Sequence, residues 1–546
     1  MAIGANRAPT GNVQENLQYN TELNGDLMIT ASKSDLFVEG LSGSVLLGQN
    51  INQRVSQDLG LDVQQLNSPG FYNVSNGNVF TASDETFTKR RLVGFYADFN
   101  FEYKDYLFLE LQGRVDKSST LPKSDNSYFY PMVGLSFVPT SAFNIASNVL
   151  SYAKVRASAA KVGKDANPYL LNSVYVGTTY GNNVASIAFP MTIGSATVPG
   201  FSPSSRIGSN NLTPEFVTSY ETGINLGLFQ NKLSVDAGYF YTESENLIFN
   251  VAVSNASGFD TKTTNVGLIT NRGIELEIAA TPIKTSNFSW DIALNWTRIR
   301  NEVVKITDGV TSSNVTGNSF TGIAPSIAEG YPYGVIIGTA LTRNENGDPL
   351  INGTTGAFMP GTAGKVIANP NPDWIGGLTN TFTYKNLSLS ALVDVKYGMD
   401  LYSFGWVDLR SNGSLAITAK DRELPRILPG VIDNGDGTYT KNYIQVSSQT
   451  YWQGLGGLAS EAAVFDATTY RLRELTLNYQ LPARFLSRTP FGGVSVGASG
   501  RNLFFYAPYA PGDPELNTQG AGNIQGMDLS GAPNTRNYGF NVRITL

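Results

Sequence analysis

Apolar and polar residues alternate with a period of two over most of this chain. In the segment Phe288 to Trp296, Phe, Trp, Ile, Leu and Trp occupy every second position, and Ser, Asp, Ala and Asn lie between them. Successive side chains of a β-strand point to opposite faces, so this segment has one apolar face and one polar face. The segments Tyr220 to Leu228, Leu233 to Tyr241 and Ile274 to Ala280 show the same pattern. The pattern predicts β-strands rather than helices.

The whole chain carries about fifteen segments of this kind. Tight turns, such as Lys385-Asn386, alternate with long polar connections, such as Gly163 to Pro214 and Lys305 to Pro372. Long connections are also expected from residue 48 to about Thr86 and between Tyr241 and Ile274. Because every second connection is long, all long loops leave the sheet on one side. This alternation of short and long connections is typical of an all-β, antiparallel up-and-down transmembrane β-barrel, whose long loops are extracellular. The other predicted strands are Leu17–Thr30, Leu36–Leu47, Val93–Tyr103, Leu107–Val115, Tyr128–Phe137, Val149–Ala160, Leu378–Tyr384, Leu387–Tyr397, Tyr470–Tyr479, Val494–Asn502 and Tyr538–Leu546.

The composition agrees with a membrane barrel. Charged residues make up 15% of the 546 residues, against roughly 25% in soluble proteins. The 56 Gly, 27 Tyr and 29 Phe residues suit a lipid-facing wall with aromatic girdles. No stretch approaches about eighteen consecutive apolar residues, which excludes a membrane-spanning helix. The net charge of -6 argues against nucleic acid as a partner.

The chain contains no cysteine and no histidine. Disulfides, thiolate metal sites and cysteine nucleophiles are therefore excluded. A Ser-His-Asp triad and a His-bound zinc are excluded as well. Glu275 and Glu277 lie two residues apart on one strand face, about 7 Å apart, as a glycosidase pair could. Polar residues are the rule on the inner face of a barrel, so we expect no catalytic residue, no cofactor and no enzyme activity.

Five segments resemble the SusC/RagA-like branch of TonB-dependent outer-membrane transporters. They follow one another in the same order as in that family and span nearly the whole chain. The segments are NLTPEFVTSYETGINLGLFQNKLSVDAGYFYTESENLI (Asn211–Ile248), TNVGLITNRGIELEI (Thr264–Ile278), NPNPDWIGGLTNTFTYKNLSLSALVDVKYG (Asn369–Gly398), YRLRELTLNYQLP (Tyr470–Pro482) and RNLFFYAPYAPGDPELN (Arg501–Asn517).

The resemblance implies a barrel of about 22 strands, preceded by a plug domain and a TonB-interacting segment. About fifteen strands would be the C-terminal part of such a barrel, and an odd number would leave two sheet edges unpaired. We therefore interpret residues 1–546 as the C-terminal portion of a transporter barrel domain without a plug. The residues from Met1 to Arg7 show no export signal.

The resemblance also implies a function and partners. SusC-like transporters import oligosaccharides or peptides across the outer membrane of Gram-negative, Bacteroidota-like bacteria. A SusD-like surface lipoprotein closes over the loops, and the TonB complex supplies energy through the plug. The expected partners are therefore this lipoprotein, TonB, outer-membrane lipid and an oligosaccharide or peptide. A barrel adhesin or structural protein, or a passive pore, is the alternative, and an outer-membrane hydrolase is the weakest one because the chain has no histidine.

Candidate ligand contacts lie in one long loop. Its aromatic side chains could stack on sugar rings, although packing within the loop is the simpler interpretation. These five residues are Tyr402, Phe404, Trp406, Tyr451 and Trp452. Asp433 and Asp436 in Asp-Asn-Gly-Asp-Gly could hold Ca²⁺, but the sequence lacks the distal Glu of an EF-hand loop and fits an ordinary turn. We therefore predict no metal site.

Two other features concern the barrel wall. The resemblance suggests that the last strand carries the signal read by the barrel-assembly machinery, although that signal often ends in Phe and this chain ends in Leu. The residues of this signal are Gly539, Phe540, Val542, Ile544 and Leu546. Arg471 and Arg473 lie on one face of a predicted strand, where they could meet a plug or anionic lipid headgroups.

Overall fold

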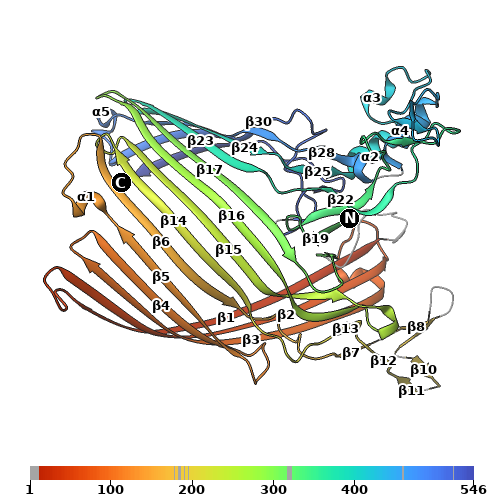
Figure 1. The fold of residues 1–546 in the computed structure, drawn as a ribbon, viewed down its shortest axis with the longest axis horizontal. Coiled ribbons are helices and arrows are strands. Elements are labelled where there is room, and N and C mark those ends of the chain that lie inside the picture. The colour runs from red at the N-terminus through yellow and green to blue at the C-terminus, as the bar shows by residue number, and fades with distance from the viewer. Residues whose placement is uncertain are drawn as a thin grey trace. The chain divides into compact units, whose positions relative to one another are not determined.

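A computed structural model describes residues 11–177, 179–181, 186–189, 191–194, 196–315, 322–457, 460–520 and 522–546. Its main element is a 16-stranded sheet in which fifteen strands are neighbours in chain order and β13 (Arg206–Ile207) pairs with β16 in parallel (Figure 1). The order begins at β1 and ends at β32. The fifteen strands are β1 (Asn12–Lys33), β2 (Leu41–Leu66), β3 (Gly77–Tyr103), β4 (Leu107–Ser118), β5 (Ser127–Phe137), β6 (Leu150–Lys164), β14 (Glu215–Leu228), β15 (Leu233–Ala252), β16 (Thr261–Lys284), β17 (Phe288–Lys305), β23 (Trp374–Tyr384), β24 (Leu387–Tyr397), β29 (Thr469–Gln480), β30 (Gly493–Tyr506) and β32 (Asn537–Thr545). The prediction of about fifteen antiparallel strands is confirmed. The segment Met1–Arg7 lies outside the described residues.

The chain forms two compact units. Unit 1 comprises Met1–Leu135, Ser158–Thr218 and Ser244–Val266, and unit 2 comprises Ser136–Ala157, Ser219–Glu243 and Gly267–Leu546. Within unit 1, β1 to β4 pair in antiparallel fashion. Within unit 2, β16, β17, β23, β24, β29, β30 and β32 do the same.

The predicted faces of the strands are confirmed in unit 2. On the polar face of β24, Ser390 and Thr381 share a hydrogen bond of 3.0 Å between their hydroxyl oxygens. On the apolar face, the ring of Trp290 in β17 stacks on that of Phe382 in β23, with centroids 5.8 Å apart. Leu389 and other large apolar side chains of that face are exposed, as lipid contact requires.

β2 and β3 are much longer than the sequence predicts. β2 continues to Leu66 and β3 begins at Gly77, so the polar loop expected up to about Thr86 is wrong. The part of β3 that precedes Leu92 pairs with β2 alone, because β4 pairs only with Leu92–Tyr103. Outside a bilayer neither face of a strand needs to be apolar, and this stretch therefore lacks the alternating signal. The expected long connection between Tyr241 and Ile274 is likewise short, since β15 and β16 extend into it.

From β16 onward the alternation of short and long connections is confirmed, whereas β2–β3 and β15–β16 are joined by the short connections 67–76 and 253–260. In unit 2 the connections 285–287, 385–386 and 481–492 are short, whereas 306–373, 398–468 and 507–536 are long. The long ones carry small elements, and α2 and α4 lie close to β25 and β28 in Figure 1. No helix among the described residues is long and apolar enough to cross a membrane. The remaining elements are η1 (Val74–Asn76), α1 (Pro139–Ala142), β7 (Tyr175–Gly177), β8 (Thr179–Gly181), β9 (Ser186–Ala188), β10 (Met191–Ile193), β11 (Ala196–Val198), β12 (Phe201–Pro203), η2 (Asn255–Ser257), β18 (Ser312–Asn314), β19 (Ala324–Ala328), β20 (Val335–Ala340), β21 (Leu350–Ile351), β22 (Thr362–Ala368), β25 (Asp400–Ser403), α2 (Phe404–Ser411), α3 (Ala416–Ala419), β26 (Val431–Asp433), β27 (Tyr439–Lys441), α4 (Ser448–Gly457), η3 (Ser460–Ala463), β28 (Val464–Asp466), α5 (Ala483–Leu486) and β31 (Met527–Asp528).

Candidate functional site

The long loops of unit 2 pack around a hydrophobic core of their own. Its buried members come from all three loops, so the loops form one packed layer rather than separate excursions. They are Ile323, Ile336, Ala368, Tyr402, Ala463 and Met527. Backbone pairing of β25 with β28 and with β31 adds to this layer. A packed layer can hold side chains in fixed positions for a ligand.

Three of the predicted loop aromatics pack within this layer. Tyr402 is 4% exposed and belongs to the buried core. Phe404 packs against the same core. The Trp406 ring meets the Phe465 ring edge-on, with centroids 4.9 Å apart. Packing accounts for the positions of these side chains, and their contact with a ligand stays a prediction.

The other two loop aromatics lie on α4. The rings of Tyr451 and Trp452 meet edge-on, with centroids 5.1 Å apart. The guanidinium of Arg426 lies over both rings, at 5.5 Å and 5.1 Å from their centroids. Tyr451 packs against a second buried cluster that contains Leu428, whereas Trp452 lines a pocket.

A larger pocket of about 700 Å³ lies where the loops of unit 2 meet β16, β17 and β23. Six of its seventeen lining residues carry amide side chains, and Arg300, Tyr333 and Trp374 add a charge and two aromatic rings. Carboxamides both donate and accept hydrogen bonds, which suits sugar hydroxyls and peptide backbones alike. The amide side chains that line it are Asn271, Asn301, Asn369, Asn371, Asn523 and Gln525.

Hydrogen bonds fix the amides of this pocket. Asn301 Nδ2 donates to Asn271 Oδ1 at 2.6 Å, which joins β17 to β16. Asn371 Nδ2 donates to the Tyr333 carbonyl at 2.9 Å and to Asn369 Oδ1 at 3.0 Å. Burial raises the pKa of the Tyr333 hydroxyl, which keeps this hydroxyl protonated. The pocket therefore combines preoriented amides and a protonated tyrosine with one charged side chain, that of Arg300.

The sequence alone did not single out this pocket. Its lining residues come from segments as distant as Asn271 and Asn523, and nothing in the local pattern joins them. Asn-Pro-Asn-Pro at 369–372 lies in one of the resembling segments, and its two prolines restrict the backbone there. Among the sequence features, only this motif points to the pocket.

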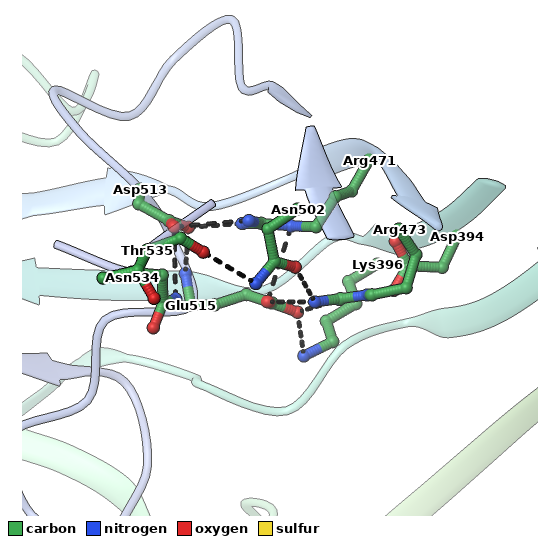
Figure 2. A network of polar contacts seen from close by, with 9 residues as sticks. All are labelled: Asp394, Lys396, Arg471, Arg473, Asn502, Asp513, Glu515, Asn534 and Thr535. Carbon is green, nitrogen blue, oxygen red and sulfur yellow. Dashed lines mark hydrogen bonds and ion pairs between the residues drawn. The ribbon is translucent and has the colours of Figure 1, made fainter. Parts of the chain in front are cut away.

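Arg471 lies on β29 beside the last long loop, and its side chain is 2% exposed. Its Nη1 donates to Asp513 Oδ2 at 3.3 Å, and Nη2 also binds Asp513 (Figure 2). Its Nε lies 3.4 Å from Glu515 Oε2. Asn534 Nδ2 donates to Asp513 Oδ2 at 3.1 Å. Asp513 and Glu515 of the last long loop thus pair with Arg471 on β29.

Arg473 extends this network along the same face. Its Nη1 donates to Glu515 Oε2 at 2.9 Å, and its Nε donates to Asp394 Oδ2 at 2.9 Å. Lys396 Nζ lies 2.8 Å from Glu515 Oε1. Figure 2 shows that Glu515 lies among the three cationic side chains. The two arginines, for which the sequence suggested a plug or lipid headgroups, are thus paired with carboxylates of this chain.

The electrostatics of Glu515 follow from its partners. Burial alone would raise the pKa of this carboxyl group. Hydrogen bonds from Arg473 and Lys396 outweigh burial and lower the pKa of Glu515 to about 2. Glu515 is therefore ionised at neutral pH, and its charge holds the segment around Asp513 against β24 and β29.

The calcium candidates form an ordinary turn between β26 and β27. Asp433 Oδ1 accepts a hydrogen bond from the Gly435 amide at 2.8 Å. Asp436 Oδ1 accepts from the Thr438 amide at 2.9 Å, and its hydrogen bonds to Thr438 lower the pKa of Asp436. In the described parts of the chain, no three Asp or Glu side chains cluster as metal ligands. Local hydrogen bonding accounts for both carboxylates.

The last strand, β32, pairs with β30 over Asn537–Thr545. The apolar members of the predicted assembly signal are exposed on one face of it, and Gly539 lies opposite Ser499. These exposed residues are Phe540, Val542, Ile544 and Leu546. Their recognition by an assembly machinery stays a prediction.

Long antiparallel strands with an apolar outer face, a polar inner face and long loops on one side define an outer-membrane β-barrel protein. Over residues 4–503 the chain matches the family described as TonB dependent receptor-like, beta-barrel. The chain belongs to this family, which consists of transporters and receptors of the outer membrane rather than enzymes.

Several relatives are similar over most of this chain. TonB-dependent receptor P26 of Formosa agariphila is 25% identical over 98% of this chain and 53% of its own length. TonB-dependent receptor SusC of Bacteroides thetaiotaomicron is 24% identical over 79% of this chain and 42% of its own length. The chain thus spans about half the length of the curated relatives it matches. The solved structure of the RagAB peptide transporter superposes with a TM-score of 0.73 at 17% identity, over 97% of this chain and 56% of that one. This likeness shows a shared fold.

Proposed function

We propose that this chain forms barrel wall and outer loops of a SusC-like importer that takes up oligosaccharides or peptides across the outer membrane of a Bacteroidota-like bacterium. The amide-lined pocket of about 700 Å³ carries the proposal. Neutral amides beside aromatic rings bind polar, uncharged surfaces of such solutes. The RagAB structure is described as a peptide transporter, which supports peptides as one solute class, and the sequence resemblance to SusC-like importers supports oligosaccharides.

The proposed import needs partners. A plug that contacts TonB supplies energy, and a SusD-like surface lipoprotein covers the loop side and retains the solute above the pocket. The packed layer of long loops offers this lipoprotein a fixed surface. Loop aromatics such as Trp452 are proposed to add solute contacts on that side.

Uptake measurements test this function. Deletion of the gene in the bacterium that carries it should abolish uptake of at least one labelled oligosaccharide or peptide, and a proton uncoupler should do the same in the parent strain. Trp374→Ala removes an aromatic wall of the pocket and should lower uptake about two- to tenfold, since ring stacking contributes about 0.5 to 1.5 kcal/mol. Tyr443→Ala removes an exposed aromatic outside this pocket and serves as the control. Energy-independent uptake would instead favour a passive pore.

A further inference from the structure

The short-turn end of unit 2 carries charge of one sign. Residues 138–149, 229–232, 284–287, 385–386 and 481–492 contain five cationic side chains and no Asp or Glu. These turn cations are Lys232, Lys284, Lys385, Arg484 and Arg488, and all five are exposed. The three long connections of the same unit, 306–373, 398–468 and 507–536, contain 16 carboxylate side chains against 8 cationic ones. The short-turn end of unit 2 is therefore basic, whereas its long loops are acidic.

The turn cations form no ion pair within the described part of unit 2. The ion pairs that the structure shows there all involve other residues. Two of the cations lie over neighbouring rings instead. Lys385 Nζ is 5.5 Å from the centroid of the Tyr384 ring, and the guanidinium carbon of Arg484 is 4.9 Å from that of the Phe485 ring. A ring attracts a cation without neutralising its charge, so these side chains remain available to an anion.

Backbone hydrogen bonds of 2.7 to 2.9 Å place the short turns side by side. These bonds run from Phe229 N to Val149 O, from Thr281 N to Lys232 O, from Lys385 N to Asn287 O and from Gln480 N to Asn386 O. The turns thus follow one another along the edge of the wall in the order of the strands they join. The five cations therefore belong to one continuous basic rim and are not isolated charges.

A row of lipid-facing side chains ends just before this rim. Its members lie on five neighbouring strands, and each is the register partner of the next. They are Phe288, Tyr384, Leu387, Tyr479 and Val496. Aromatic rings near the ends of barrel strands mark the boundary between hydrocarbon and headgroups. The basic rim, which lies just beyond these rings, is therefore at the level of the lipid headgroups.

We propose that the basic rim of unit 2 binds the phosphate groups of anionic phospholipids in the periplasmic leaflet, with Lys385, Arg484 and Arg488 as its main contacts. The short turns face the periplasm, because the long loops of such a barrel are extracellular. Lysine binds phosphate as a point charge, and arginine does so through paired N–H groups. The exposed rings of Tyr384 and Phe485 meet the adjoining acyl chains. This site follows from the membrane class of the protein and does not depend on the solute proposed above.

The test uses the whole chain, extracted from the outer membrane in mild detergent, and native mass spectrometry with added lipid. The probe is dioleoylphosphatidylglycerol, and zwitterionic dioleoylphosphatidylcholine, with the same acyl chains, is the matched lipid. Phosphatidylglycerol should bind at least tenfold more tightly. A variant with Lys385→Gln, Arg484→Gln and Arg488→Gln should bind phosphatidylglycerol at least tenfold more weakly and phosphatidylcholine as before, since each cation near an anionic surface contributes about fivefold.

Two further variants separate position from charge. Lys365→Gln, Lys420→Gln and Lys441→Gln together remove three exposed lysines of the long loops and should leave both affinities unchanged. A variant with Lys385→Arg, Arg484→Lys and Arg488→Lys keeps the charge of the rim and should keep the preference for phosphatidylglycerol. An equal loss in the long-loop variant would assign the preference to the net charge of the chain and overturn the proposal.

The unaltered protein also decides if the glutamine variant fails to fold. Phosphatidylglycerol with a photoreactive headgroup should label 385–386 and 481–492, and labelling of the long loops alone would overturn the proposal. Equal affinity for the two lipids, or undiminished binding by a folded glutamine variant, would overturn it as well. Displacement of the lipid by an equal concentration of glycerophosphoglycerol, which is the headgroup without acyl chains, would assign the rim to a soluble anion instead.

Discussion

Asp513→Asn removes one negative charge from beside Arg471, whose side chain is 2% exposed, while the shape of the side chain is kept. Truncating one partner of a buried ion pair costs about 3 to 5 kcal/mol, because the other charge stays buried without compensation. Glu515 remains 3.4 Å from Arg471 Nε and offsets part of that cost. We therefore expect a loss of about 2 to 4 kcal/mol.

This loss should be confined to the last long loop, 507–536. The loop can detach from β29 and let water reach Arg471 while the strands stay folded. The lost stability therefore favours local opening of the loop rather than unfolding of the sheet. A loss of about 2 to 4 kcal/mol raises the population of the open loop about 30- to 700-fold. Hydrogen exchange measured by mass spectrometry should show this increase at the amides of 507–536, such as Thr518, whose N–H donates to the Met527 carbonyl at 2.9 Å.

Glu22→Gln is the control for the loss of a carboxylate. Glu22 pairs with Arg54 at 3.0 Å, but the two side chains are 48% and 61% exposed. Water replaces such a partner, so exchange should not change measurably. Unaltered exchange of 507–536 in Asp513→Asn would refute the conclusion that the buried pair holds the loop. A uniform increase over all strands would show that the pair stabilises the whole sheet instead.

Three further outcomes follow from the same structure. The pKa of Glu515 is about 2 in the folded protein and 4.5 ordinarily. Its ionised side chain therefore contributes about 3 kcal/mol to the stability of the folded state, fully above about pH 4.5, and this contribution is lost as the pH falls towards 2. Pepsin should therefore cleave 507–536 increasingly as the pH falls over that range. Asp165→Asn leaves Arg90 and the buried Ser118 without their carboxylate, and urea unfolding in detergent should show a loss of about 3 kcal/mol. Gly526→Ala forces a left-handed residue, φ +72°, to place its Cβ 2.5 Å from Pro370 Cβ, and should cost about 1 to 3 kcal/mol and lower solute uptake.

Controls accompany these outcomes. Cleavage by pepsin is normalised to that of the urea-unfolded chain at each pH, and a constant ratio would contradict the assignment to Glu515. A midpoint for Asp165→Asn within error of the unaltered protein would show that Arg90 is solvated in place. Gly347→Ala has the same kind of backbone, φ +86°, with no atom within 4 Å of the new Cβ. Equal effects of the two glycine changes would assign the cost to the backbone and not to the contact with Pro370.

The strands of the wall could be predicted because their signal is local. In β17 and β24 each side chain faces either lipid or the polar interior, and that choice alone sets the period of two. The same reasoning failed in the part of β3 before Leu92, where polar residues occupy both faces of the strand. Strand boundaries in that region depend on pairing with a partner strand, which no single segment reveals.

The sites depend on contacts between distant residues, and the sequence gives few of these. Among the described residues no acceptor meets the Nε and Nη2 atoms of Arg410, which only the three-dimensional structure shows. For Tyr402 the sequence left ligand stacking and packing within its loop open, and residues from three long connections pack with it in a buried core. Arg471 lies on β29, and its partner Asp513 lies in the loop 507–536. Such pairings are set by the packing of the loops and not by a periodic pattern.

The length of β3 has a consequence for where a solute first meets the protein. Its 27 residues extend about 90 Å along the strand, at about 3.3 Å per residue. At a tilt of about 45° this gives about 60 Å of height, against an apolar band of about 25 Å. The β2–β3 ribbon therefore stands some 35 Å clear of the lipid, roughly the diameter of a small domain. A bacterium with a carbohydrate coat thinner than that would keep this ribbon in reach of the surrounding medium.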